Sequence, residues 1–402
     1  MKKLIALLLA AVIVLGVFAG CENNAADGTK VAMITDYGDI TDQSFNQTTW
    51  EAVVKFGADN DVEVKYFKPD TNDTAGRVAK VELAIAEGYN VIVMPGYAFG
   101  GTIAEVSGEY PDVKFIALDV AKGDLLEGGV ALKGESYDYN PDNWDLSKYV
   151  HMDNVYCAIY QEELCGYMAG YAAVKLGYTK LGFLGGMAVP AVIRYGYGFV
   201  QGCDAAAKEL DIKVDIKYVY GNQFFGDADI TAYMDNWYQN GTEVVFACGG
   251  GIYTSAVDAA KKVDGAKVIG VDVDQAAIIA AYAAGEGASA EEIAKWNDLT
   301  VTSAMKGLAP TTIDTLTDVI INDKWADYAG KIDTLGLISG DDASKNYVQI
   351  ASTTKFVDGK FTAADYATLV KGMFDGTIKV SNDISAEPAV TNATVEYLGN
   401  IK

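Results

Sequence analysis

Carboxylates, glycines and aromatic side chains stand directly after several short apolar runs of this sequence. Asp36, Asp119 and Asp272 each close such a run, and Gly250 follows another. Carboxylates accept hydrogen bonds from hydroxyl and amine groups, glycines let a ligand approach backbone N–H groups, and aromatic rings offer stacking faces. This combination of groups is suited to holding a small polar ligand without changing it.

Groups that could catalyse a reaction are scarce. The chain has one histidine, His151, in a stretch typical of a surface loop, so a Ser-His-Asp or Cys-His site would have to depend on it. The sequence has no C-x-x-C pair, no G-x-x-x-x-G-K-[ST] loop and no G-x-G-x-x-G after a strand. A carboxylate pair of a glycosidase is easily imagined among 55 acidic residues and is therefore uninformative. We predict a protein that is not an enzyme and uses no cofactor or metal.

The elements that would position these residues follow from the hydrophobic pattern. Near-continuous apolar runs predict strands buried on both faces, at 31–36, 91–95, 113–119, 181–185, 244–248, 268–272 and 301–304. Helical patterns lie between them, at 45–57, 77–87, 162–176 and 255–263. This alternation predicts an α/β fold with parallel sheets, in which ligands bind outside the carboxyl ends of the strands.

The N-terminus has the order of a secretory signal peptide. Lys2 and Lys3 precede a mostly apolar run over 4–18, and Ala19 and Gly20 stand before Cys21. A small residue before a cysteine resembles the lipobox of bacterial lipoproteins, which implies cleavage after residue 20 and a lipid on Cys21. The polar segment 21–30 would then be a tether. The apolar run is short for the alternative, an uncleaved transmembrane anchor.

Size and charge limit the architecture and the partners. About 380 residues would follow the signal peptide, which is too long for one core and predicts two domains. The net charge is −24, and loss of Lys2 and Lys3 gives 29 − 55 = −26. A strongly acidic surface is repelled by phosphate backbones, which excludes nucleic acid as a partner, and by anionic lipid headgroups. The lipid, rather than the protein surface, would hold the chain at the membrane.

Residues 36–56, DYGDITDQSFNQTTWEAVVKF, resemble the opening motif of the basic membrane protein (Bmp) family of ABC-transporter substrate-binding lipoproteins, which includes purine nucleoside receptors. Asp36, Asp42, Ser44, Phe45, Asn46 and Gln47 carry the motif. The similarity continues through VKFIALD, LGFLGGM, YGNQFFGDAD, EVVFACGGG, VIGVDVDQ and VTSAMKGL, and covers most of residues 30–307.

The resemblance implies a two-lobed type I periplasmic-binding-protein fold, in which each lobe is a parallel sheet flanked by helices and the ligand is captured as the lobes close. We expect residues 31–158 and 274–304 in the first lobe, and residues 159–273 and 305–402 in the second. The crossings between lobes are expected near 154–161, 272–275 and 304–306.

The resemblance also implies a set of ligand contacts. The nucleoside receptors hold a base between two phenylalanines, matched here by Phe45 and Phe225, with Phe224 as the alternative to Phe225. Asp119 matches a residue that contacts the base, and Asp36 and Asn46 match positions near the base and the sugar. Gly250, Asp272 and Lys306 match contacts to the ribose.

The predicted function is that of an extracytoplasmic, lipid-anchored receptor that passes a nucleoside, preferably a purine nucleoside, to an ABC permease. The expected state is a monomer on the outer face of the cell membrane. Gln43 and Ile193 depart from residues that are usual in the family, so a riboflavin-like or sugar-like ligand is an alternative. A lipid-anchored sensor or adhesin with the same fold is a second alternative.

Overall fold

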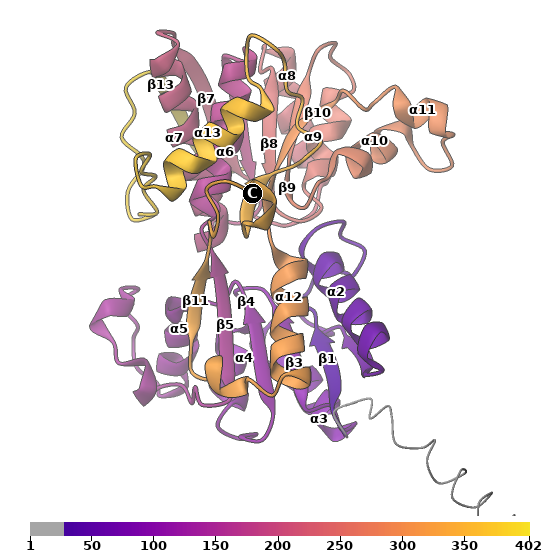
Figure 1. The fold of residues 1–402 in the computed structure, drawn as a ribbon, viewed down its shortest axis with the longest axis vertical. Helices are drawn as coiled ribbons and strands as arrows, with labels where there is room; N and C mark the ends of the chain where they lie inside the picture. The colour runs from indigo at the N-terminus through magenta and orange to yellow at the C-terminus, as the bar shows by residue number, and fades with distance from the viewer. Residues whose placement is uncertain (1–27) are drawn as a thin grey trace, which may run out of the picture.

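The computed structural model describes residues 28–402, which form two lobes, each built on one sheet (Figure 1). The predicted signal peptide, Cys21 and most of the tether lie outside the described residues. Within residues 28–402, no helix combines the length and the apolar character that a membrane crossing requires.

The first lobe contains a six-stranded parallel sheet in the order β11-β5-β4-β3-β1-β2. Its strands are β1 (Lys30–Ile34), β2 (Glu63–Phe67), β3 (Val91–Pro95), β4 (Lys114–Leu118), β5 (Val155–Tyr160) and β11 (Ile332–Leu335). Its helices are α2 (Phe45–Asn60), α3 (Thr74–Ala86), α4 (Phe99–Val106), α5 (Lys122–Leu132) and α12 (Leu308–Leu316), with shorter turns η1 (Pro141–Asn143), η2 (Leu146–Lys148), η3 (Thr317–Ile321) and η4 (Trp325–Asp327).

The second lobe contains a seven-stranded sheet in the order β12-β10-β9-β8-β6-β7-β13. Its strands are β6 (Lys180–Gly185), β7 (Val214–Tyr220), β8 (Val244–Cys248), β9 (Lys267–Asp272), β10 (Thr300–Lys306), β12 (Val348–Ile350) and β13 (Ala393–Asn400). Its helices are α6 (Glu162–Leu176), α7 (Pro190–Glu209), α8 (Ala228–Gln239), α9 (Tyr253–Ala260), α10 (Ala276–Ala284), α11 (Ala290–Ala294), α13 (Ala363–Phe374) and the turn η5 (Ala343–Lys345). The sheet is parallel except for β12, which runs antiparallel to β10.

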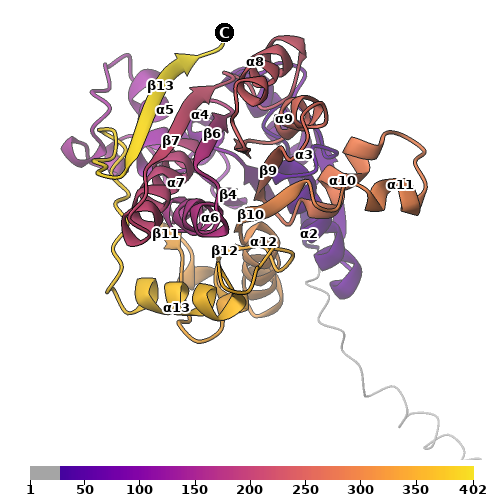
Figure 2. The same cartoon turned by 90° about the horizontal axis from the view of Figure 1, so that it is seen from above.

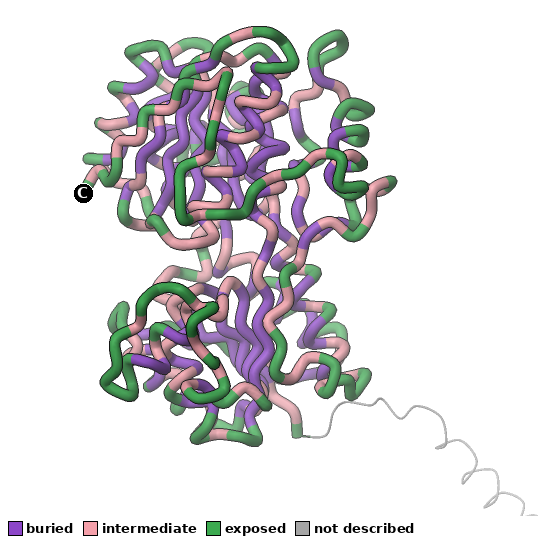
Figure 3. The backbone as a smooth tube through the Cα atoms, turned by 90° about the vertical axis from the view of Figure 1, so that its left-hand side faces the viewer, coloured by how far each residue is buried: buried purple, intermediate pink, exposed green. Residues whose placement is uncertain are grey.

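Helices cover both faces of each sheet, which explains why the central strands are apolar throughout. In the first lobe α3, α4 and α5 pack side by side on one face and α2 packs with α12 on the other. In the second lobe α8, α9 and α10 cover one face, and α6 and α7 cover the other with α13 outside them (Figure 2). The buried strands run through the centre of both lobes in Figure 3.

The predicted boundary of the lobes is wrong in two segments. Residues 274–304 were expected in the first lobe, but β10 pairs in parallel with β9 in the second sheet, with Thr300 opposite Val268. The segment through α10 and α11 is therefore a strand–helix–strand crossover that returns beside the strand it left. Conversely, α12 and β11 belong to the first lobe, although residues 305–402 were assigned to the second.

The chain crosses between the lobes three times, at 160–162, 306–308 and 335–348. The crossings predicted near 154–161 and 304–306 are present, and the one predicted near 272–275 is absent because β9 and β10 share a sheet. The third crossing, between β11 and β12, was not predicted.

Helices α6 and α7 pack backbone against backbone through glycines. A Cβ on Gly198 would lie 2.1 Å from the backbone oxygen of Glu163, and one on Gly202 would lie 2.1 Å from that of Tyr167. On the facing helix, Gly166 and Gly170 would meet the backbone of α7 at 2.2 Å and 2.3 Å. These glycines therefore allow the two helices to pack closely. The spacing of Gly198 and Gly202 in α7 reflects this packing and not a phosphate-binding motif.

Replacing Gly198 by alanine is expected to lower the free energy of unfolding by about 1–3 kcal/mol, because the added methyl group forces two helix backbones apart. Urea denaturation of both proteins measures the difference.

Gly123→Ala is the matched control, because the nearest atom to its added Cβ, the hydroxyl of Tyr137, lies at an ordinary 3.6 Å. It should leave stability within about 1 kcal/mol of the parent or raise it, since alanine favours helix. Equal stability of the two variants would contradict the close-packing explanation.

Candidate functional site

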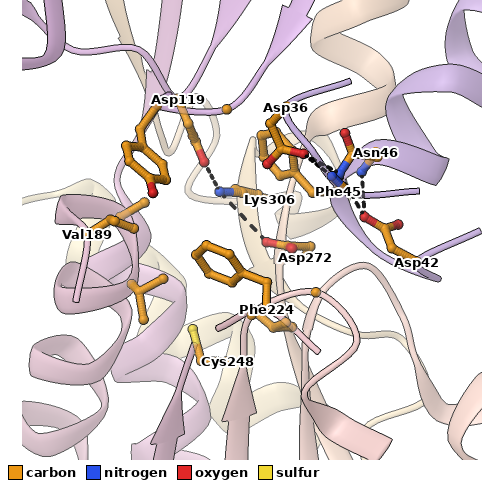
Figure 4. Close-up of a pocket in the computed structure, with 18 of the residues that line it drawn as sticks. Asp36, Asp42, Phe45, Asn46, Asp119, Val189, Phe224, Cys248, Asp272 and Lys306 are labelled. Carbon is orange, nitrogen blue, oxygen red and sulfur yellow. Dashed lines mark hydrogen bonds and ion pairs between the residues drawn. The ribbon is translucent and has the colours of Figure 1, made fainter. Parts of the chain in front are cut away.

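A cavity of about 390 Å³ lies between the lobes, where the carboxyl ends of the two sheets face each other (Figure 4). Its volume falls in the range of small-molecule sites. All the residues predicted to contact a ligand line it: Asp36, Phe45, Asn46, Asp119, Phe225, Gly250, Asp272 and Lys306. The structure thus brings together residues that are up to 270 positions apart (306 − 36).

Left-handed backbone turns bring two of the carboxylates into the cavity wall. Asp119 follows β4 with φ 60°, and Asp272 ends β9 with φ 65°. Residues other than glycine seldom adopt this conformation, and Asp and Asn adopt it several times more often than most. Such strain persists where the surrounding structure holds it, commonly at functional sites. Both strands therefore turn at the carboxylate itself.

Two glycines after β8 make room for the aromatic loop that faces them. Gly249 has φ 143° and Gly250 has φ 52°. A Cβ on Gly250 would lie 2.7 Å from the backbone oxygen of Phe224, and one on Gly249 would lie 2.8 Å from the Phe224 ring. The glycines let the segment of Phe224 pass directly over the end of the strand.

The loop between β1 and α2 is held by its own carboxylates. Asp36 accepts hydrogen bonds from the backbone N–H groups of Tyr37 at 2.6 Å and Gly38 at 2.7 Å. Asp42 accepts from the backbone N–H of Asn46 at 3.0 Å and so caps α2. The Asn46 side-chain amide donates to both carboxylates, at 3.2 Å to Asp36 and 3.1 Å to Asp42. Burial raises the pKa of both aspartates, and these hydrogen bonds oppose the rise.

A buried ammonium group stands at the centre of the cavity. The Lys306 side chain is 3% exposed and forms ion pairs with Asp119, with Glu162 at 3.6 Å and with Asp272 at 3.7 Å. Burial alone would lower the pKa of Lys306, but the three carboxylates outweigh it and raise the pKa above its ordinary value. Lys306 therefore stays charged and joins Asp119 of the first lobe to Asp272 and Glu162 of the second.

Further hydrogen bonds join the lobes beside this ion cluster. Ser44 Oγ, from the loop before α2 in the first lobe, donates to Asp272 of the second lobe at 2.6 Å. Within the second lobe, Tyr195 Oη donates to the same carboxylate at 3.3 Å. The Gln275 side-chain amide donates to the backbone oxygen of Gln43 at 3.2 Å. Asp272 is thus a junction between the lobes as well as part of the cavity wall.

Aromatic rings flank the ion cluster. The Lys306 ammonium lies 4.7 Å from the centre of the Phe45 ring. The Phe224 ring, half-buried, points into the cavity in Figure 4, whereas Phe225 lies at the cavity wall with 55% of its surface exposed. Phe224, which was predicted as the alternative to Phe225, is therefore the more enclosed of the two rings.

Sequence reasoning missed Asp124, Glu162 and Tyr195. Asp124 lines the cavity and accepts from the backbone N–H of Ala121 at 2.8 Å, and its burial raises its pKa to about 7. Glu162 is fully buried and binds the Arg194 Nε–H at 2.6 Å. Glu162 lies two residues after the end of β5, a strand that was not among those predicted, so the strand-end rule that selected Asp119 did not reach it. Tyr195 lies within a helix and gave no signal.

Other candidates for chemistry contribute little to this cavity. His151 is exposed and does not line it. The four described cysteines are buried thiols; Cys248 lines the cavity, whereas Cys157, Cys165 and Cys203 do not. In the part of the chain that the structure describes, no group of three His, Cys, Asp or Glu side chains has the arrangement of a metal site.

Known proteins similar in sequence to this chain belong to one family. The Bmp family model, described as "ABC transporter substrate-binding protein PnrA-like", matches residues 29–337. The "ABC transporter nucleoside-binding protein BmpA" of Lactococcus lactis is 28% identical over 389 residues, covering 90% of this chain and 98% of that protein. Basic membrane protein B of Borreliella burgdorferi is 26% identical, covering 61% and 65%.

Solved structures share the fold. An ABC transporter solute-binding protein from Aeropyrum pernix superposes with a TM-score of 0.60 at 17% identity, covering 87% of both chains. One from Conexibacter woesei gives 0.60 at 20% identity, covering 88% of this chain and 99% of that one. The chain therefore has the two-lobed type I periplasmic-binding fold, and it belongs to the Bmp family of PnrA-like ABC transporter substrate-binding proteins.

Proposed function

We propose that this protein is an extracytoplasmic, lipid-anchored receptor that captures a nucleoside, preferably a purine nucleoside, between its lobes and delivers it to an ABC importer. The observation that carries the proposal is a single cavity in which aromatic rings lie beside a carboxylate–lysine cluster drawn from both lobes. The aromatic part is suited to the flat face of a base, and the charged part to the hydroxyls of a sugar. The name of the Lactococcus relative, a nucleoside-binding protein, supports this choice of ligand.

In the proposed complex the base stacks on Phe45, with the second face supplied by the Phe224–Phe225 segment of the other lobe. Asp272 and Lys306 meet the ribose hydroxyls, and the backbone at Gly250 approaches the same edge. Because these groups come from both lobes, a ligand that touches all of them favours the closed arrangement of the lobes.

In this function the protein binds its ligand and does not convert it. The cavity has no histidine among its lining residues, so no imidazole is at hand for general acid–base catalysis. We expect the ligand to be released unchanged and to pass to the partner permease. The receptor itself is expected to act as a monomer.

Calorimetric titration of residues 22–402 with guanosine, inosine, adenosine, riboflavin and ribose tests the ligand class. We expect one nucleoside per chain at micromolar affinity or tighter, with Phe45→Ala weakening binding roughly 5- to 150-fold because base stacking contributes about 1–3 kcal/mol. Phe224→Ala should weaken binding more than Phe225→Ala, since the Phe224 ring is the one inside the cavity.

Phe374→Ala, an aromatic on α13 that is 47% exposed and away from the cavity, serves as the control and should bind as the parent does. Heat with riboflavin or ribose and none with any nucleoside would overturn the nucleoside assignment.

Replacing Cys21 by serine is expected to move the protein from the membrane fraction to the soluble fraction, because the serine hydroxyl cannot take the thioether-linked lipid. Fractionation and intact-mass measurement check this outcome, with nucleoside titration as the control that the globule is unaffected. A Cys21→Ser protein that stays with the membrane would contradict lipid anchoring.

A further inference from the structure

The loop of residues 221–227, between β7 and α8, carries the two phenylalanines that the second lobe contributes to the cavity. The first half of this loop is bound to the end of β6, because the backbone N–H groups of Gly221 and Asn222 each donate to that segment at 2.8 Å. The direction of the Phe224 ring therefore depends on what fixes the second half, up to Asp227.

Asp227 uses its two carboxylate oxygens for different tasks. Its Oδ1 atom accepts from the backbone N–H groups of Asp229 and Ile230, both at 3.0 Å, and so caps α8. Its Oδ2 atom accepts from the Gln223 side-chain amide at 2.7 Å and from the Lys402 ammonium. One oxygen thus belongs to the helix, and the other holds the loop.

Gln223 transmits this contact to the backbone beside the aromatic rings. An ionised carboxylate only accepts hydrogen bonds, so the Nε2 group of Gln223 faces Asp227. The same Nε2 group donates to the backbone oxygen of Phe225 at 2.9 Å. The side-chain bonds therefore fix the loop on both sides of Phe224.

The start of α9 supports the loop from another side. A Cβ on Gly226 would lie 2.1 Å from Thr254 Oγ1, so the backbone passes close to that helix. The backbone N–H of Asp227 donates to Ser255 Oγ at 2.9 Å. Asp227 is thus the point where a contact with α9 and a contact with Lys402 meet.

The edge strand β13 brings Lys402 to this point. β13 runs parallel to β7 with Asn400 opposite Tyr220, and the backbone N–H of Ile401 donates to the Tyr220 oxygen at 2.8 Å. Because the strands are parallel, the residues that follow them leave the sheet at the same edge, which is the edge at the cavity. Figure 2 shows the chain after β13 ending next to α8.

The ion pair of Lys402 is partly exposed, with 35% of the lysine side chain and 25% of the Asp227 side chain accessible. A second carboxylate, that of Asp229, lies 3.6 Å from the same ammonium. Exposed pairs add little to the stability of a whole domain. A loop that is already held in its binding conformation, however, loses less conformational freedom when a ligand arrives, and this favours binding.

We propose that Lys402 is a positioning residue for ligand binding, which acts through Asp227 and Gln223 to keep the Phe224 ring turned into the cavity. The inference rests on the proposed nucleoside function. Lys402 is not one of the described residues that line the cavity, so its effect reaches the ligand only through the loop.

Lys402→Gln removes the charge and keeps a side chain of similar length. We expect the variant to bind nucleoside about 2- to 5-fold more weakly than the parent, the size of an exposed ion pair. Its melting temperature should stay within about 4 °C of the parent, and Lys402→Arg should restore affinity. Calorimetric titration with guanosine, inosine and adenosine measures the affinities, and unchanged affinity of Lys402→Gln would contradict the proposal.

Asp227→Asn separates the cap of α8 from the hold on the loop, because asparagine caps helices as well as aspartate does. The variant loses the charge that both Lys402 and Gln223 contact. It should therefore weaken nucleoside binding at least as much as Lys402→Gln, and binding equal to that of the parent would count against the proposal.

A double-mutant cycle with Phe224→Ala shows whether Lys402 acts through the ring. In the Phe224→Ala protein, adding Lys402→Gln should cause no further loss of affinity, because the ring that Lys402 positions is gone. The same fold-loss in both backgrounds would overturn the proposal, since the two residues would then act independently.

Lys262→Gln is the matched control. Lys262 forms an ion pair of the same kind with Asp235 of α8 at 2.8 Å, and it does not line the cavity. This variant should bind nucleoside as the parent does, and a loss equal to that of Lys402→Gln would show a general effect of charge instead of positioning. If the parent itself binds none of the three nucleosides, the proposed function fails, whereas binding by the parent with an additive cycle overturns the role of Lys402 alone.

Discussion

The cavity and the arrangement of the lobes depend on the ion pairs of the buried Lys306 ammonium group. A buried charge costs several kcal/mol unless it is paired, and the carboxylates that pair it come from both lobes, Asp119 from the first and Asp272 and Glu162 from the second. Lys306 is also the last residue of β10, where the chain leaves the second lobe for α12 in the first. Compensation of its charge therefore favours the contact between lobes that encloses the cavity.

The walls around this charge are built by strand ends that turn sharply. Asp119 and Asp272 occupy left-handed backbone conformations, and Gly249 and Gly250 take the corresponding position after β8. The same device appears in both sheets, so polar groups of two separate lobes converge on a small volume. The left-handed conformation costs energy, and the ion cluster provides a compensating interaction for the carboxylates.

The carboxylates have different tasks despite their similar positions. Asp36 and Asp42 are occupied by backbone N–H groups and by Asn46, so they shape the loop before α2. Asp272 is occupied by Tyr195 and Lys306 of its own lobe and by Ser44 of the first lobe, and the contact with Ser44 joins the lobes. Asp119 is paired with Lys306 through Oδ2, and its buried Oδ1 has no hydrogen-bond partner.

The sequence determined the α/β class and the strand ends that line the cavity, whereas the lipid anchor stays a prediction from the N-terminal pattern. The strands at 91–95 and 244–248 match β3 and β8 because residues buried on both faces form continuous apolar runs. The edge strands β2, β11 and β13 were not predicted, since half-exposed edges mix charged and apolar residues. The edge strand β12, of three residues, is too short to give a pattern, and the interior strands β5 and β7 were also missing from the predicted set.

Tertiary structure alone decided which lobe holds residues 274–304, which of Phe224 and Phe225 points inward, and which acceptors remain free. A strand's own residues fix its type and the point where it ends. Its partner in a sheet, and the partners of a carboxylate, are set by residues that can lie hundreds of positions away, so no local pattern contains them.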